Sequence, residues 1–298
     1  MRILIYGAGV IGSLYAAYLS ESGYSVFLLA RGQRLSDLKQ NGLRYFRRGK
    51  IRHADVTIIE ALAPDDRYDY IFLTVREEQL CNALTQLREN ISPTVVTMVN
   101  TLEPYTELEQ LCGKGRLLPA FPGAGGGFSD EILDAGFTPN IVQPTTFGEM
   151  DGRCSERVKT LKRIFSKAHI PHQIVKDMHA WQICHVAMVV PLADAYYMTE
   201  KPQEADRDKN VMRHTALRLH QNFIRLHQYG ISISPIKLNL FRVCPAAILS
   251  RVLPVVFRSR FGNRFMFQHA MKAKGEMRAL HDKFYSYLEE KQNTTRCQ

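Results

Sequence analysis

The chain has 298 residues, of which 45% are hydrophobic, and its formal net charge is +10. This length is enough for about two domains, and the apolar fraction suits a globular protein with a large core. The sequence contains no apolar run of about 18 residues and opens with no apolar leader, so neither a membrane span nor a secretory signal is expected. We therefore expect a cytoplasmic protein with no membrane partner.

Six cysteines are present, and no two of them form a CxxC pair. They are Cys81, Cys112, Cys154, Cys184, Cys244 and Cys297. This spacing argues against a zinc site or a redox dithiol, so no metal is expected. Buried free thiols in a reducing compartment are the simplest interpretation.

Basic residues gather in two stretches, 44–52 and 251–278. A solvated surface is the simplest interpretation, and attraction of a phosphorylated cofactor and an acidic substrate is the alternative. No motif that reads nucleic acid accompanies this charge, so nucleic-acid binding is not expected. The sequence leaves open whether the protein forms a homo-oligomer.

Short apolar segments alternate with segments of helical spacing in the first half of the chain. Strands are predicted over 2–6, 25–30, 70–75, 94–99, 117–121 and 145–148, and helices over 13–22, 34–41 and 77–89. Segment 44–59 alternates as a β-hairpin would, and segment 123–127 is predicted to be a glycine-rich loop. Nearly all-apolar strands are typical of a parallel sheet covered on both faces, which predicts a Rossmann-type doubly wound α/β fold.

The strand signals become sparse after about residue 155, where helical spacing dominates. Helices are predicted over 157–168, 180–198, 205–229, 235–253 and 264–290, with at most a short edge strand at 174–175. This change of pattern divides the chain into an α/β domain over 1–167 and an all-helical domain over 168–298.

The first predicted strand runs directly into a G-x-G-x-x-G motif that opens a helix. The motif consists of Gly7, Ala8, Gly9, Val10, Ile11 and Gly12. In this context the first glycine permits a tight turn, the second lets the backbone approach a pyrophosphate, and the third lets the helix pack on the sheet. The helix N-terminus favours the phosphate charge. We therefore expect this turn to bind a dinucleotide.

The second predicted strand ends in Leu29-Ala30-Arg31, without Asp or Glu. Domains that bind NAD usually place a carboxylate about 20 residues beyond the glycines, where it binds the ribose 2′-hydroxyl. A guanidinium instead pairs with a phosphate in a bidentate manner. Arg31 therefore predicts NADP as the cofactor, and a surface arginine without a ligand is the alternative.

Together these residues resemble the family of ketopantoate reductases, also called 2-dehydropantoate 2-reductases. The resemblance extends over most of the chain and rests on the Ile-Tyr-Gly-Ala-Gly-Val-Ile-Gly-Ser opening and on the Leu-Leu-Ala-Arg-Gly segment. It implies that Arg76 replaces a cofactor-binding lysine in a Val-Lys-x-x-Gln segment. It also implies that Asn100 lies at the nicotinamide and the substrate, with a catalytic role, and that Gly126 lies in a small-residue loop beside the cofactor.

The second predicted domain departs further from the family's pattern. The family has a Trp-x-Lys helix whose lysine is the general acid, and this chain has Ile183 there, or Gln182 if a gap is placed upstream. Glu276 matches the glutamate of the family's Glu-x-Asp-x-x-Asn-Gly segment, which implies a catalytic role for it. Arg278 and His281 replace the aspartate and the asparagine of that segment. The chain thus resembles a divergent member without the catalytic lysine.

Hydride transfer to a ketone leaves an alkoxide that needs a proton donor, and Ile183 cannot supply one. His179, His185 and Lys176 lie near this position and are candidates for the donor. The sequence favours an NADPH-dependent oxidoreductase that reduces a small acidic carbonyl compound, similar to a 2-keto acid. A non-catalytic NADP-binding protein with a regulatory or partner role is the alternative, and the lost lysine favours it.

Overall fold

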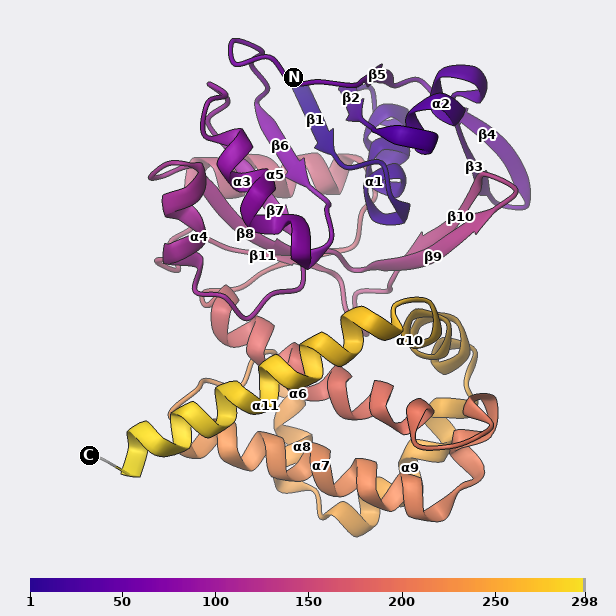
Figure 1. The fold of residues 1–298 in the computed structure, drawn as a ribbon, viewed down its shortest axis with the longest axis vertical. Coiled ribbons are helices and arrows are strands. Elements are labelled where there is room, and N and C mark those ends of the chain that lie inside the picture. The colour runs from indigo at the N-terminus through magenta and orange to yellow at the C-terminus, as the bar shows by residue number, and fades with distance from the viewer. Residues whose placement is uncertain (297–298) are drawn as a thin grey trace. The chain divides into compact units, whose positions relative to one another are not determined.

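An eight-stranded sheet lies at the centre of the first half of the chain. Figure 1 shows the computed structural model, which describes residues 1–296. The strand order is β12-β11-β8-β7-β6-β1-β2-β5, and every neighbouring pair is parallel except β8 with β11. The strands are β1 (Arg2–Tyr6), β2 (Ser25–Leu29), β5 (Thr57–Ile59), β6 (Tyr70–Leu73), β7 (Val95–Met98), β8 (Leu117–Phe121), β11 (Thr145–Phe147) and β12 (His172–Ile174). The order β5-β2-β1-β6-β7-β8 is that of a doubly wound dinucleotide-binding sheet.

The central strands are buried on both faces. Ile3, Leu4 and Ile5 of β1 point alternately to the two sides of the sheet, and each has 0% of its surface exposed. The helices of this part are α1 (Val10–Glu21), α2 (Gly32–Asn41), α3 (Leu80–Leu87), α4 (Tyr105–Cys112) and α5 (Glu156–Lys167). The predicted fold class, a Rossmann-type parallel sheet followed by a helical part, is confirmed.

A second, four-stranded sheet has the order β4-β3-β10-β9. Its strands are β3 (Leu43–Arg47), β4 (Lys50–Ala54), β9 (Ala124–Ser129) and β10 (Ile132–Phe137). The hairpin predicted within 44–59 is confirmed for β3 and β4, but Thr57–Ile59 forms β5 of the large sheet instead. The prediction of a loop at 123–127 is wrong, because Ala124–Ser129 pairs with β10.

One glycine of β9, Gly126, lies where the neighbouring strand β10 approaches closely. Gly126 has φ +152° and pairs with Ala135. A Cβ atom on Gly126 would lie 2.3 Å from the carbonyl oxygen of Asp134. Composition alone suggests a flexible loop, whereas the glycine is needed here because no side chain fits between the strands.

An ion pair anchors α5 to the end of the large sheet. The guanidinium of Arg157 donates to both carboxylate oxygens of Glu149, at 2.7 and 2.5 Å, and to the carbonyls of Gly115 and Leu117 at 2.8 and 3.0 Å. Only 8% of the Glu149 side chain is exposed. Burial opposes ionisation of this carboxyl, but the hydrogen bonds from Arg157 and Ser155 and the charge of Arg157 outweigh it and lower the pKa of Glu149.

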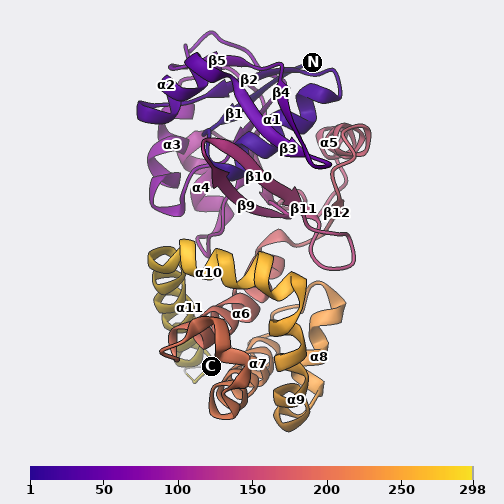
Figure 2. The same cartoon turned by 90° about the vertical axis from the view of Figure 1, so that its right-hand side faces the viewer.

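The remaining part of the chain is helical over its described residues, 179–296 (Figure 2). Its helices are α6 (Met178–Tyr197), α7 (Lys209–Gln228), α8 (Asn239–Val243), α9 (Ala246–Arg258), α10 (Gln268–Lys272) and α11 (Lys274–Arg296). The helices predicted over 235–253 and 264–290 are each interrupted, the first between α8 and α9 and the second between α10 and α11. None of the helices within 1–296 is long and apolar enough to cross a membrane.

The chain divides into two compact units, Met1–Met178 and His179–Gln298, called here the N-terminal and the C-terminal unit. The division falls at the start of α6, whereas the sequence pattern placed it between residues 167 and 168. The short strand β12 accounts for the difference in position. It pairs with β11 over three residues and so keeps the segment after α5 with the sheet.

The Arg157–Glu149 pair gives a prediction about stability. We expect Arg157→Ala to lower the free energy of unfolding of the N-terminal unit by about 3 kcal/mol, because it leaves a carboxylate and two carbonyls buried without their donor. Arg153→Ala is the matched control. Arg153 pairs with Asp151 at 2.7 Å but has 83% of its side chain exposed, so its loss should cost no more than about 1 kcal/mol. Urea denaturation of the two variants measures the difference, and equal midpoints would contradict the anchoring role.

Candidate nucleotide-binding site

Four neighbouring strands end at one edge of the large sheet, and a predicted cofactor residue follows each of them, with Arg76 after β6. Tyr6 of β1 pairs in register with Leu29 of β2 and with Leu73 of β6, and Leu73 pairs with Thr97 of β7. The sheet order reverses between β1 and β6, which is where open parallel sheets bind their ligands. The glycine turn follows β1, Arg31 follows β2, and Asn100 follows β7.

The glycine turn is held against the residue that follows β6. Thr74 donates its hydroxyl to the carbonyl of Gly7 at 2.8 Å, and its backbone N–H donates to the carbonyl of Tyr6 at 3.0 Å. Gly7 has φ +116°, a backbone conformation that favours glycine. A Cβ atom on Gly12 would lie 2.0 Å from the Gly7 carbonyl oxygen, so only glycine fits there.

Gly9 differs from the other two glycines of the turn. It precedes the first turn of α1 with φ −71°, which any residue adopts, and no atom lies within 4 Å of a Cβ built on it. Its lack of a side chain therefore serves neither backbone conformation nor packing. The space above it adjoins the N-terminus of a 12-residue helix, where unpaired N–H groups favour an anion. This open face fits a phosphate group that approaches the backbone.

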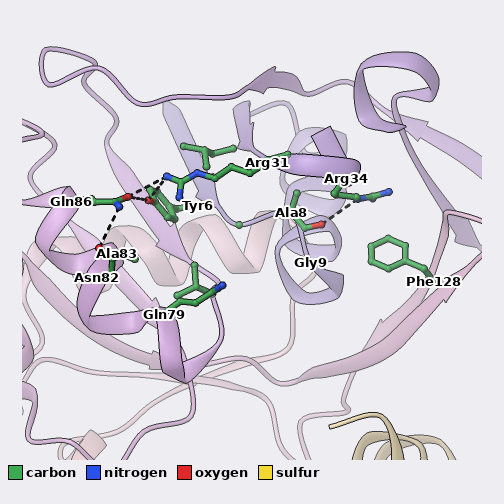
Figure 3. A pocket seen from close by; sticks show the side chains of 14 residues that line it. Tyr6, Ala8, Gly9, Arg31, Arg34, Gln79, Asn82, Ala83, Gln86 and Phe128 are labelled. Carbon is green, nitrogen blue, oxygen red and sulfur yellow. Dashed lines mark hydrogen bonds between the residues drawn. The ribbon is translucent and has the colours of Figure 1, made fainter. Parts of the chain in front are cut away.

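A cavity of about 430 Å³ opens beside this turn (Figure 3). Its walls come from the ends of β1 and β2, from the segment after β6, from α3 and from β9. It is lined by Tyr6, Gly7, Ala8, Gly9, Leu29, Ala30, Arg31, Arg34, Val75, Gln79, Asn82, Ala83, Gln86 and Phe128. A volume of this size is typical of sites for small molecules and cofactors.

Arg31 lines this cavity, and its guanidinium is held by neutral groups. Its Nη2 donates to the hydroxyl of Tyr6 at 3.0 Å and to Oε1 of Gln86 at 3.2 Å, as Figure 3 shows. The guanidinium carbon also lies 5.7 Å from the centre of the Tyr6 ring. Within residues 1–296 no carboxylate forms an ion pair with Arg31, which leaves its charge available for an anionic ligand.

Arg34 is a second cation of the cavity that the sequence did not single out. Its Nε donates to the carbonyl of Ala8 at 3.3 Å, and its guanidinium carbon lies 4.3 Å from the centre of the Phe128 ring. Its Nη1 lies 2.5 Å from a carboxylate oxygen of Asp37 and 3.5 Å from one of Glu131. Burial lowers the pKa of Arg34, against the opposing effect of these two carboxylates. The charge of Arg34 is thus compensated, and the residue ties the glycine turn to α2 and β9.

The structure brings together only some of the predicted cofactor residues. Gly7, Ala8, Gly9 and Arg31 line the cavity, whereas Val10, Ile11, Gly12, Arg76, Asn100 and Gly126 are not among its lining residues in the described chain. Arg76 is 75% exposed and lies 3.8 Å from Glu78. Asn100 is half-buried just beyond β7, and Gly126 lies within β9.

The residues of the C-terminal unit that the sequence singled out occupy different environments. Gln182 and Ile183, the two alternatives for the position of the family's lysine, have 0% and 1% of their surface exposed. His185 is also buried and stacks on Trp181, with ring centres 5.3 Å apart and planes at 4°. Glu276 is exposed on α11. His179 is half-buried at the start of α6, and Lys176, in the N-terminal unit, is exposed.

Sequence reasoning missed Tyr6, Gln86, Asn82 and Phe128 among the residues around the cavity. Tyr6 carried a signal, since a hydroxyl directly before the glycine turn stands at the carboxyl edge of the sheet. Gln86 carried none, because it contacts Tyr6 across 80 positions of sequence. Phe128 lies directly after the predicted glycine-rich loop at 123–127 and belongs to β9 in the structure.

The cysteine prediction holds only in part. Cys112 and Cys184 are buried, and burial raises the pKa of the Cys112 thiol to about 11. Cys81 and Cys154 are exposed, so the expectation of buried thiols is wrong for them, and Cys244 is half-buried. Cys297 lies outside the described residues. Among residues 1–296 no group of three or more His, Cys, Asp or Glu side chains could hold a metal ion.

The N-terminal unit is similar to known ketopantoate reductases in sequence. The family model of ketopantoate reductase PanE/ApbA matches residues 3–131. The 2-dehydropantoate 2-reductase of Archaeoglobus fulgidus is 28% identical over 178 residues, which cover 59% of this chain and 57% of the relative. That of Mesorhizobium japonicum is 28% identical over 202 residues, 60% of this chain and 61% of the relative. The chain thus spans about 57 to 61% of the length of these relatives.

Solved structures share the fold over nearly the whole chain. The 2-dehydropantoate 2-reductase of Geobacter metallireducens matches with a TM-score of 0.75 at 16% identity and covers 98% of this chain and 94% of that one. D-mandelate dehydrogenase, in a structure with NADH and anilino(oxo)acetate, matches with a TM-score of 0.67 at 16% identity and covers 98% and 96%. At these identities the likeness establishes the fold alone.

The contrast between Gly9 and Gly12 gives a prediction about nucleotide binding. We expect Gly9→Ala to fold with an unchanged melting temperature but to bind NADPH at least about tenfold more weakly, because its methyl group fills the space that a pyrophosphate needs. Gly12→Ala is the comparison, since its methyl group meets the Gly7 carbonyl and should destabilise the unit by about 2 kcal/mol or more. Thermal denaturation and calorimetric titration separate the two effects. Unchanged affinity in Gly9→Ala would contradict the proposed phosphate position.

Proposed function

We propose that this chain is an NADPH-dependent oxidoreductase that reduces a small carbonyl compound, a 2-keto acid in the manner of the 2-dehydropantoate 2-reductases. The observation that carries the proposal is the open face of Gly9 beside a helix N-terminus, with an uncompensated Arg31 at the same cavity. The match of residues 3–131 to the ketopantoate reductase family model supports it. The net charge of +10 suits an anionic cofactor and an acidic substrate.

Each end of the cofactor has candidate residues in the N-terminal unit. The turn Gly7–Gly12 would hold the pyrophosphate, and Arg31 would pair with the 2′-phosphate that distinguishes NADPH from NADH. Arg76 and Gly126 are proposed as further cofactor residues by their place in the family's pattern. Bound NADPH would supply the hydride, and Asn100, which follows β7 at the same sheet edge, would orient the carbonyl that accepts it.

Glu276 is the residue of the C-terminal unit that we propose for catalysis, through its match to the family's glutamate. Its carboxylate would bind and orient a hydroxyl or carbonyl group of the substrate. The proton that the reduced carbonyl takes up needs another donor, and His179, His185 and Lys176 are the candidates near the position of Ile183. His185 has only 6% of its surface exposed, whereas His179 is half-buried and Lys176 is exposed. A positive charge on His185 would therefore lose more hydration than a charge on either of the other two candidates.

A second candidate function is a non-catalytic NADP-binding protein with a regulatory or partner role. The observation that favours it is the burial of both Gln182 and Ile183. Neither side chain ionises, so neither alignment places a general acid at this point of α6. The two candidates share the cofactor and differ in turnover.

The cofactor preference is tested by titration. We expect the wild type to bind NADPH at least about tenfold more tightly than NADH, because a guanidinium pairs with the extra phosphate through charge-assisted hydrogen bonds. Arg31→Ala should lose most of that difference, and Arg31→Lys should keep part of it. Isothermal calorimetry with each nucleotide measures the constants. Equal affinities of the wild type for NADPH and NADH would refute the preference.

Turnover is tested with a panel of 2-keto acids that includes 2-dehydropantoate. We expect one or more members to be reduced with loss of NADPH absorbance, and Glu276→Gln to lower kcat/KM by about a hundredfold if its charge orients the substrate. Glu289→Gln is the matched control, since Glu289 is also exposed on α11 and has no proposed role. Tight NADPH binding without turnover of any member would favour the second candidate.

A further inference from the structure

A three-residue polar cluster holds the guanidinium of Arg31 in place. Tyr6 lies at the end of β1, Arg31 directly after β2, and Gln86 on α3. Arg31 Nη2 donates to the Tyr6 hydroxyl at 3.0 Å and to Gln86 Oε1 at 3.2 Å, and the Tyr6 hydroxyl donates to the same Oε1 at 2.7 Å. Figure 3 shows the three side chains converging. The cluster therefore fixes Arg31 from two neighbouring elements.

The amide of Gln86 is itself oriented. Its Nε2 donates to Oδ1 of Asn82, one helical turn earlier, at 3.4 Å. This directs the amide oxygen, an acceptor, toward Arg31 and Tyr6. The cluster also stands between two cavities, since its three members line both the cavity of about 430 Å³ and a second one of about 260 Å³. The guanidinium is thereby held at the edge of both cavities.

Both groups that hold Arg31 are uncharged, and this determines what Arg31 can bind. Its hydrogen bonds within residues 1–296 use Nη2 alone, which leaves the N–H groups of Nε and Nη1 as donors for an anionic partner. Arg34, three residues later, has its charge compensated by Asp37 at 2.5 Å. A carboxylate at position 86 would form an ion pair with Arg31 and compensate its charge, as Asp37 does for Arg34.

We propose that Tyr6 and Gln86 are positioning residues that set the preference for a 2′-phosphorylated nucleotide, by orienting Arg31 without neutralising it. The inference rests on the proposed function, because it concerns the same cofactor. It assigns the specificity to three side chains instead of one. It also predicts that the preference depends on residue 86 being uncharged, and not only on its hydrogen bond to Arg31.

The test measures the dissociation constants of NADPH and NADH for the full chain and three variants. We expect Gln86→Glu, which keeps shape and acceptor but adds a charge, to lower the ratio of the NADH constant to the NADPH constant by about tenfold. Tyr6→Phe removes one acceptor and should lower the ratio by about threefold. Gln33→Glu is the matched control, because Gln33 is exposed two residues from Arg31 and is not a cavity residue, and its ratio should stay within about twofold of the wild type.

The outcomes separate this inference from the proposed function. A wild type that binds neither nucleotide, or both equally, contradicts the proposed function. A wild type that prefers NADPH and keeps its ratio in Gln86→Glu and Tyr6→Phe contradicts the inference alone. An equal loss in Gln33→Glu and Gln86→Glu would also overturn it, because net charge would then explain the effect. Circular dichroism melting curves show whether each variant is folded, and the exposed Gln86 keeps the test valid if Tyr6→Phe is unstable.

Discussion

The close packing of the glycine turn on Thr74 is the constraint on which the candidate site depends. The Thr74 hydroxyl binds the Gly7 carbonyl, and a side chain on Gly12 would collide with both of these groups. This contact joins β1 to β6 at the point where the strand order reverses, and α1 begins three residues after Gly7. The N-terminus of α1 is therefore fixed at the carboxyl edge of the sheet. The residues that line the cavity lie at the ends of β1 and β2, after these strands and β6, on α2 and α3, and on β9.

The sequence predicts well those elements that depend on the spacing of residues close together in the chain. Alternating apolar segments and the glycine spacing predict β1, α1 and β2, because each depends on residues close in sequence. The same reasoning fails for β9, where glycines suggest a loop. Gly126 is a glycine because β10, the next strand of the same hairpin, approaches it, and the glycine content alone does not reveal that pairing. Gln86 shows the same limit at the site. Its role depends on Tyr6, and no local pattern connects residues 80 positions apart.

In the C-terminal unit, the choice between Ile183 and Gln182 as the position of the family's lysine has little physical consequence. The resemblance predicts that Ile183, or Gln182 if a gap is placed upstream, takes the place of the family's lysine. Both of these side chains are buried and neither ionises. The two alignments therefore lead to the same physical conclusion about α6. If the proposed reduction takes place, its proton donor would have to be a group that ionises, which directs the search to residues that flank the helix instead of those within its buried face.

The charge of Arg31 can remain without a counter-charge because Arg31 is exposed, whereas the more buried charge of Arg34 needs one. Arg34 is largely buried between the glycine turn, α2 and Phe128, and a buried charge needs a counter-charge, which Asp37 provides. Arg31 is exposed and keeps its hydration, so neutral acceptors are enough to orient it. A ligand phosphate would then gain the full attraction of the guanidinium without first displacing a carboxylate. The two arginines thus differ although they lie three residues apart, since Arg34 holds the glycine turn and Arg31 keeps its charge for the anionic ligand that we propose.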